Sequence, residues 1–329
     1  MQSGRDGAAP RAITHREMVG MDTSRPPVGP TIPTLQLNFD QNSIFLYRCH
    51  AVRCLSEVIV GTGMTSTTLG DGTRVFCLKP QEAKVLDSHI EGYMNHGIRV
   101  QPGDTVFDVG ANIGMFGMRM AQQCDGDIRV IAFEPIPAIR ACTERNLEPW
   151  DQANVLPYGI ARARGEATFT FYPNAPSLSS AHLEDWDGQD GALEEAVVGN
   201  ARNAPMWYAK YLPRFLAKPI ARWLVHAPIE VHCELRTLSE IIDEHNVEQI
   251  DLLKIDCEGA EEEALLGLTD PDWSRVQQAV IEVHDIDGRL ERVEAMLRAH
   301  GLTELVVEKE PALENTRLSN VYAHRPRSE

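Results

Sequence analysis

Acidic, amide and glycine residues gather at the end of an apolar segment in this sequence. The stretch Asp-Val-Gly-Ala-Asn-Ile-Gly at 108–114 begins inside a predicted strand, 105–110, and Glu134 lies 20 residues beyond Gly114. Glycines allow a ligand to approach the backbone, and an acid at this spacing can accept two hydrogen bonds from a ribose diol. The pattern predicts a binding site for a cofactor that contains adenosine.

The turn at 108–114 distinguishes two such cofactors. A dinucleotide turn reads G-x-G-x-x-G, and its middle glycine lets the pyrophosphate come close to the backbone. Counted from Gly110, that position is Asn112, whose side chain obstructs a pyrophosphate but can hydrogen-bond an amino-acid moiety. Asp108 can attract the ammonium group of that moiety, directly or through water. We therefore expect S-adenosylmethionine. An NAD-dependent oxidoreductase and a non-catalytic binding scaffold are the alternatives.

Other strand ends carry groups that suit proton transfer. The candidates for a catalytic base are Asp256, Glu258, Glu282 and His284. His284 has an intrinsic pKa near neutrality, which suits a base, but it can equally be a residue that only orients a neighbour. Lys254 is expected on the same strand face as Asp256, where it can pair with an acid such as Glu282. Glu258 can instead belong to the first turn of the following helix.

A divalent ion is a minority interpretation of the same strand ends. Oxygen and nitrogen atoms that could bind Mg²⁺ are present in Asp256, Glu282, His284 and Asp285. Their spacing does not establish a metal site, so we expect none.

The elements that must position these residues alternate between strand and helix. After 105–110, the predicted strands are 129–135, 154–161, 249–259 and 276–285. This order predicts an α/β fold, with a parallel sheet covered by helices on both faces. Ligands bind outside the carboxyl ends of such strands. The segments 302–310 and 318–325 have no helix between them and should form an antiparallel pair.

Three regions are expected along the chain. Residues 1–30 read as a disordered leader. Residues 31–100 read as an N-terminal cap of strands and one helix, with a hairpin turn at 70–72 and a helix from Pro80 to Gly97. Residues 101–329 form the cofactor-binding domain.

A long insertion, about 184–229, interrupts this domain. Its basic and aromatic part, 204–228, is broken by two prolines and suits either a lid over the site or a surface insertion packed on the core. Three serines before it, Ser177, Ser179 and Ser180, can contact the cofactor or acceptor, although loop composition explains them as well.

Composition narrows the classes of protein. The net charge of −17 argues against nucleic-acid binding, and 43% hydrophobic residues suffice for a substantial core. No apolar run approaches 18 residues and no secretory signal is visible, so no membrane span and a cytoplasmic location are expected. The 7 cysteines contain no C-x-x-C pair and suit reduced, buried thiols.

Four segments together resemble the FkbM family of S-adenosylmethionine-dependent methyltransferases. They are VFDVGANIGMFGMRMA, VIAFEPIP, LLKIDCEGAEEEALLGL and AVIEVH, and the resemblance covers about residues 90–325. It implies a class I methyltransferase fold, a doubly wound seven-stranded sheet whose last strand is antiparallel. It also implies methyl transfer, usually to a hydroxyl oxygen, on polyketides, other secondary metabolites or glycans.

We therefore expect an O-methyltransferase that acts on a hydroxyl of a small secondary metabolite of polyketide or peptide type, which can be carrier-borne. A sugar or glycan hydroxyl is the alternative acceptor, and a homodimer is left open. The expected catalytic residues are His284, Asp256, Glu282 and Lys254. The expected cofactor-binding residues are Asp108, Gly110, Asn112, Ile113, Gly114, Glu134, Pro135, Gly159, Ile160 and Asp256.

Overall fold

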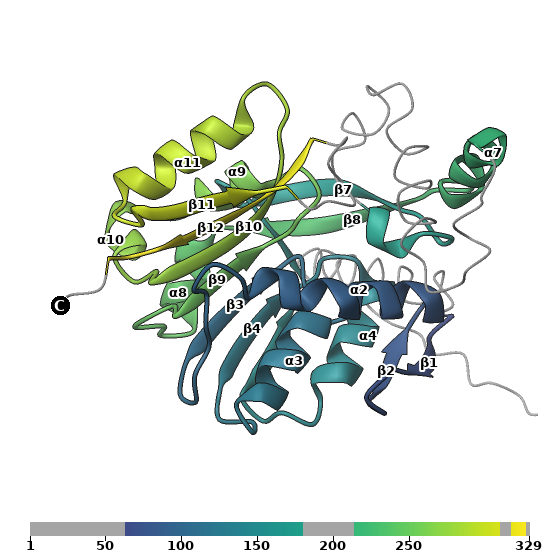
Figure 1. Ribbon diagram of the computed structural model, residues 1–329, viewed down its shortest axis with the longest axis horizontal. Helices are drawn as coiled ribbons and strands as arrows, with labels where there is room; N and C mark the ends of the chain where they lie inside the picture. The colour runs from purple at the N-terminus through teal and green to yellow at the C-terminus, as the bar shows by residue number, and fades with distance from the viewer. Residues whose placement is uncertain (1–62, 180–213, 310–316, 327–329) are drawn as a thin grey trace, which may run out of the picture. The chain divides into compact units, whose positions relative to one another are not determined.

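The computed structural model describes residues 63–179, 214–309 and 317–326, and its centre is a seven-stranded sheet (Figure 1). The strands, in the order in which they lie across the sheet, are β11 (Glu304–Glu308), β12 (Leu318–His324), β10 (Gln278–His284), β9 (Leu252–Ile255), β3 (Thr105–Val109), β4 (Arg129–Phe133) and β5 (Ala153–Leu156). From β10 to β5 all neighbours are parallel, whereas β12 is antiparallel to both β10 and β11. This is the class I methyltransferase sheet that the resemblance implies, with β12 inserted between β10 and β11.

The central strands are buried on both faces, so their sequences are nearly continuous apolar runs. Adjacent residues point to opposite faces: Val106 belongs to one hydrophobic core and Phe107 to the other. The first core contains residues of α2 (Pro80–Tyr93), α3 (Met115–Gln123) and α4 (Pro137–Leu147). The second contains residues of α8 (Leu238–Glu244), α9 (Glu261–Leu265), α10 (Asp270–Trp273) and α11 (Arg289–Ala299). In Figure 1, α3 and α4 lie side by side, and α11 lies on the other side of the sheet.

A second, three-stranded sheet corrects two expectations. Its order is β6 (Tyr158–Ile160), β8 (Ile229–Arg236), β7 (Gly165–Phe171). The predicted single strand 154–161 is in fact β5 and β6, which belong to different sheets. The break falls at Pro157, which has no backbone N–H to donate to a ladder. The insertion was predicted to extend to about residue 229, which in the structure is the first residue of β8.

The N-terminal region shares a core with the main sheet. β1 (Thr65–Thr68) and β2 (Arg74–Cys77) form the expected antiparallel hairpin. The side chain of Asn146 in α4 accepts a hydrogen bond from the N–H of Phe76 and donates one to its carbonyl, which fixes the hairpin on α4. Helix α2 begins at Pro80, as predicted, but ends at Tyr93, before Gly97. The expected leader 1–30 and the strands expected before residue 63 lie outside the described residues.

Only part of the expected lid is described. Helix α7 (Arg214–Leu224) contains Pro219, so this proline lies within a helix and does not break it. Ala217 and Ala221 of α7 are buried, whereas Trp223 is largely exposed. Residues 180–213, which include the first part of the basic and aromatic segment (204–213), lie outside the described part. Across the described ranges, every helix is too short or too polar to cross a membrane.

Candidate active site

Two neighbouring cavities lie at the carboxyl ends of β3, β4, β9 and β10. We name the first the turn cavity, because the turn after β3 forms one wall. It encloses about 650 Å³, including solvent at its mouth. Of the residues predicted to bind a cofactor, those that line it are Gly110, Asn112, Glu134, Pro135, Gly159, Ile160 and Asp256. These residues come from four elements, and the fold brings them to one place.

The glycines of the turn are required by close packing. At Gly110, with φ +73°, a Cβ would lie 1.8 Å from the carbonyl oxygen of Asp256. At Gly114, with φ +76°, a Cβ would lie 2.8 Å from Cγ2 of Thr143. Neither position tolerates a side chain, because the turn is pressed against the loop after β9 on one side and against α4 on the other. Gly114 and Ile113 do not line the turn cavity.

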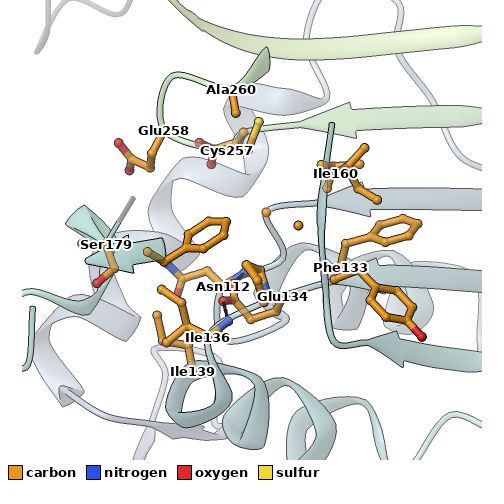
Figure 2. Close-up of a pocket in the computed structure, with 18 of the residues that line it drawn as sticks. Asn112, Phe133, Glu134, Ile136, Ile139, Ile160, Ser179, Cys257, Glu258 and Ala260 are labelled. Atoms are coloured by element: carbon orange, nitrogen blue, oxygen red, sulfur yellow. Dashed lines mark hydrogen bonds between the residues drawn. The ribbon is translucent and has the colours of Figure 1, made fainter. Parts of the chain in front are cut away.

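Glu134 is the buried acid of the turn cavity (Figure 2). Its carboxylate accepts hydrogen bonds from the N–H groups of Asn112, at 3.1 Å, and Ile136, at 2.9 Å. Burial raises the pKa of Glu134 to about 8, although these donors and Arg140 favour the charged form. A carboxylate has about four acceptor sites, so two remain for further hydroxyl donors.

Asp108 lies beneath the turn and does not reach the cavity. Its buried carboxylate is 3.2 Å from Nζ of Lys254, which also donates a hydrogen bond to the carbonyl of Gly110 at 2.9 Å. Nζ lies 3.6 Å from Asp256. Burial opposes the charge of Lys254, but the carboxylates of Asp108 and Asp256 outweigh it and hold its pKa above the usual value. Lys254 therefore stays protonated and ties the turn to the loop after β9.

We name the second cavity the α2 cavity, because one face of helix α2 forms a wall of it. It encloses about 850 Å³, including open solvent. The face of α2 that lines it consists of Glu82, Val85, Leu86, His89, Ile90 and Tyr93. Met115, Phe116, Lys254 and Glu282 form much of the rest. The two cavities share Gly110, Asn112, Ser177, Asp256 and Glu258, so they adjoin along the turn and the loop after β9.

Tyr93 connects two carboxylates of the α2 cavity. Its hydroxyl oxygen lies 2.9 Å from Oδ2 of Asp256 and 3.3 Å from Oε2 of Glu282. A phenol has one proton to donate, so the two carboxylates compete for it. Its ring contacts Phe116 edge-to-face, and Nζ of Lys254 lies 5.6 Å from the ring centroid. Tyr93 is thus held firmly where three predicted catalytic residues meet.

His284 is buried between two carboxylates and lines neither cavity. Nδ1 lies 3.1 Å from Glu261 and Nε2 lies 3.4 Å from Glu258. Burial opposes its charge, but these two neighbours outweigh burial and hold the pKa of His284 well above the usual value. A protonated imidazole cannot accept a proton, so this geometry favours the orienting role over that of the base.

The residues considered as magnesium ligands are not gathered around one point. Within the described ranges there is no group of three or more His, Cys, Asp or Glu that could hold a metal. Asp285 instead accepts a hydrogen bond from the N–H of Leu290 at the start of α11.

Sequence reasoning missed the α2 side of the site. Glu82, His89 and Tyr93 recur at helical spacing, and this periodicity was their only signal. Glu258 precedes α9 with a φ of +52° and lines both cavities, so it is not part of the first helical turn. Ser177 and Ser179 line the turn cavity, whereas Ser180 lies outside the described residues.

Known proteins share much of this sequence. A model of the Methyltransferase FkbM domain matches residues 108–302. The 31-O-demethyl-FK506 methyltransferase FkbM of Streptomyces tacrolimicus is 35% identical over 261 residues, which cover 78% of this chain and 95% of that protein. The AMB antimetabolite synthetase AmbE of Pseudomonas aeruginosa is 35% identical over 269 residues, which cover 78% of this chain but 12% of AmbE.

Among solved structures, the crystal structure of Methyltransferase FkbM from Methylobacillus flagellatus aligns with 73% of this chain and 51% of its own length. The TM-score is 0.44 and the sequence identity is 14%. The fold assignment depends on the sheet order described above and not on this likeness. The domain match and the long alignment with the Streptomyces protein are sufficient for an assignment: this chain belongs to the FkbM methyltransferase family.

Proposed function

We propose that this protein is an S-adenosylmethionine-dependent O-methyltransferase that acts on a hydroxyl of a small secondary metabolite. The observation that carries the proposal is the pair of adjoining cavities, one with a buried acid beside a glycine turn and one lined by carboxylates. The names of its relatives support it: one is an O-demethyl-FK506 methyltransferase, and another an antimetabolite synthetase. A carrier-borne acceptor stays a prediction.

The turn cavity fits the adenosine part of S-adenosylmethionine. Glu134 can accept hydrogen bonds from both ribose hydroxyls, which would favour its charged form against the cost of burial. Ile136, Ile139 and Ile160 offer apolar surface to a planar base. Asn112 and the turn belong to the wall that the two cavities share, and the amino-acid part of S-adenosylmethionine would reach this wall. When bound, S-adenosylmethionine supplies a methyl group on a positively charged sulfur, which becomes neutral when an oxygen accepts that methyl.

Glu282 is the better placed base for the acceptor hydroxyl. Asp256 and Glu282 both line the α2 cavity and share the hydroxyl of Tyr93. Nζ of Lys254 lies 3.6 Å from Oδ2 of Asp256, so this carboxylate already pairs with an ammonium group, and we assign the proton transfer to Glu282. In this assignment Glu282 takes the proton of the acceptor, Asp256 orients the acceptor, and Lys254 holds Asp256.

His284 acts on the site through Glu258. It lies behind Glu258, which lines both cavities, and it is itself fixed by Glu261 of α9. The carboxylate of Glu261 also accepts a hydrogen bond from the N–H of Gly259 at 2.6 Å. These contacts hold the loop 256–260, so we assign His284 as a positioning residue and not as the base.

Calorimetric titration tests the cofactor assignment. We expect S-adenosylmethionine to bind and NAD not to bind. Replacing Glu134 with Gln should weaken binding by about tenfold or more, because a ribose diol loses a charged acceptor. The matched control is Glu148→Gln, an exposed acid at the end of α4. If NAD bound and S-adenosylmethionine did not, the oxidoreductase alternative would replace this proposal.

A further inference from the structure

A loop after β7 contributes to the walls of both cavities. We name residues 172–179 the β7 loop. Pro176, Ser177 and Ser179 line the turn cavity, and Ser177 lines the α2 cavity as well (Figure 2 labels Ser179). The glycine turn and Glu134 follow strands of the seven-stranded sheet, whereas β7 belongs to the three-stranded sheet. The position of the β7 loop beside them is therefore set by tertiary contacts and not by a shared strand ladder.

The β7 loop is a compact unit. The hydroxyl oxygen of Ser179 accepts a hydrogen bond from the N–H of Tyr172 at 3.1 Å, which joins the two ends of the loop. Between these ends lies one turn of 3₁₀ helix, η1 (Pro176–Leu178), and Ala175 and Pro176 are buried. Because the loop is closed in this way, a contact that fixes one of its residues also restrains the others.

Glu82 of helix α2 holds the β7 loop through Ser177. Oε1 of Glu82 accepts one hydrogen bond from the backbone N–H of Ser177, at 2.9 Å, and another from its hydroxyl. Two donors of one residue converge on one carboxylate oxygen, so both the main chain and the side chain of Ser177 are fixed. The loop has a further attachment at Asn174, whose Nδ2 donates to the carbonyl of Trp223 in α7 at 2.9 Å.

Glu82 acts on the β7 loop as a hydrogen-bond acceptor. Burial raises the pKa of Glu82, whereas the two donors of Ser177 favour its charged form. The charged and the neutral carboxyl group both have an oxygen that can accept these bonds, and so does the amide of glutamine. The acceptor role can therefore be separated from the charge by substitution.

A loop without this anchor would bind a ligand less well. Replacing Glu82 with a residue that has no acceptor would leave both donors of Ser177 without their partner, and the β7 loop would sample positions away from the turn cavity. A ligand in that cavity would then have to order the loop as it binds, which lowers the apparent affinity. Glu82 can have this effect although it does not itself line the turn cavity.

We propose that Glu82 is a positioning residue for the cofactor: through Ser177 it holds the β7 loop against the turn cavity and so strengthens cofactor binding from outside that cavity. The inference rests on the proposed function, because it takes the turn cavity as the cofactor site. It adds a residue of α2, far in sequence from the glycine turn, to those that determine cofactor affinity.

Calorimetric titration with S-adenosylhomocysteine tests the effect on affinity. Glu82→Ala should raise the Kd by about tenfold, whereas Glu82→Gln keeps an acceptor and should stay within about threefold of wild type. Glu91→Ala is the matched control, because this acid lies on the same helix, is exposed and lines neither cavity. Denaturant unfolding establishes that each variant is folded at the titration temperature. A wild-type Kd for Glu82→Ala would overturn the inference.

A double-mutant cycle tests whether the effect passes through Ser177. Ser177→Ala removes the hydroxyl but keeps the N–H, so it should raise the Kd by about threefold. Added to Glu82→Ala, it should cause no further increase, because the bond is already lost. Effects that multiply in the double variant would show that the two residues act independently, contrary to the inference.

The charge of the cofactor separates positioning from direct attraction. S-adenosylmethionine has a positive sulfur and S-adenosylhomocysteine has a neutral one. If Glu82→Gln bound the first much more weakly and the second as wild type does, Glu82 would act by attracting the sulfur, and the positioning role would be wrong. We expect Glu82→Gln to bind both nearly as wild type does.

Hydrogen exchange on the protein without ligand tests the contact itself. Backbone amides in peptides that cover residues 172–179 should exchange faster in Glu82→Ala than in wild type, and at the wild-type rate in Glu91→Ala. Unchanged exchange in Glu82→Ala would contradict the inference. If wild-type protein bound no S-adenosylhomocysteine, the proposed function would fail, and the exchange rates would still decide whether Glu82 holds the β7 loop.

Discussion

The turn cavity and the α2 cavity adjoin, but they are built from different parts of the chain. Main-chain groups and a short local motif shape the turn cavity, where Glu134 is held by two backbone N–H groups. Side chains from distant segments shape the α2 cavity, where Tyr93 and Asp256 are 163 residues apart. The difference indicates that the turn cavity depends more on backbone geometry, whereas the α2 cavity depends more on exchangeable side chains.

The largest expected effect comes from a change that breaks both cavities at once. In Gly110→Ala the new Cβ would meet the carbonyl of Asp256, a backbone atom that cannot move without moving the loop after β9. We expect a loss of about 5 kcal/mol in the free energy of unfolding, or failure to fold, measured by denaturant unfolding.

Gly165→Ala is the control for this change, because a Cβ at that position would have no atom within 4 Å and its φ is not left-handed. It should leave stability near the wild-type value. Equal stability of the two variants would show that the turn and the loop are not pressed together as described.

A substitution in the α2 cavity should affect methyl transfer without affecting cofactor binding. Glu282→Gln keeps the shape of the α2 cavity but removes the base, so methyl transfer should fall by about a hundredfold or more, or roughly 3 kcal/mol in the barrier. Transfer of a labelled methyl group to a panel of small hydroxylated acceptors measures this.

In the same variant, binding of S-adenosylhomocysteine should not change. Glu291→Gln on α11 is the matched control, because that acid is exposed and lines neither cavity. Wild-type turnover of Glu282→Gln would transfer the role of base to Asp256. Loss of cofactor binding would show that the two cavities are not independent.

The free energy of unfolding should depend on pH through Glu134 in the turn cavity. The pKa of Glu134 is raised from 4.5 to about 8 in the folded protein, so folding is favoured while the group is protonated. This contribution is complete below the unfolded pKa and is lost as the pH rises toward 8. Relative to Glu134→Gln, the wild type should lose about 2.5 kcal/mol of stability between pH 5 and pH 7.

Denaturant unfolding of both proteins at several pH values measures that difference. Saturating S-adenosylhomocysteine should reduce it, because ribose hydroxyls would stabilise the charged carboxylate. If the difference in stability between the wild type and Glu134→Gln did not change with pH, Glu134 would be ionised throughout. If saturating S-adenosylhomocysteine left this difference unchanged, the ribose would bind elsewhere.

The smallest expected effect concerns Tyr93. Tyr93→Phe keeps the ring against Phe116 but removes the hydroxyl shared by Asp256 and Glu282. We expect turnover to fall by about tenfold, with the Kd for the cofactor unchanged, since one hydrogen bond to a charged group is lost. Separate determination of kcat and KM is the measurement. An unchanged kcat would show that Tyr93 contributes through the packing of its ring and not through its hydroxyl.

The sequence predicted the sheet and the turn cavity because their signals are local. The apolar runs before Gly110, Glu134 and Asp256 each became a parallel strand within a few residues of the predicted bounds. Local signals also had limits. Pro157 divides what read as one strand, and β8 was missed because its alternating pattern directly follows the insertion.

The α2 cavity could not be predicted, because it exists only once distant segments have packed. Nothing near Tyr93 in the sequence indicates that it meets Asp256 and Glu282. The sequence left two roles open for His284, a base or an orienting residue, because its environment of two carboxylates is a tertiary property that the sequence does not show. The ion pair of Lys254 with Asp108 could not be predicted either, because it too forms only when distant segments pack together.

The attachment of α2 has a practical consequence for engineering. This helix of 14 residues is joined to other segments by Glu82 with Ser177, by Asp87 with Arg119 of α3, and by Gly92 with Tyr322. The residues between these attachments that face the cavity can be exchanged as a cassette, without altering the sheet or the glycine turn. A library confined to Val85, Leu86 and His89 would therefore vary the wall of the α2 cavity and leave the turn cavity unchanged.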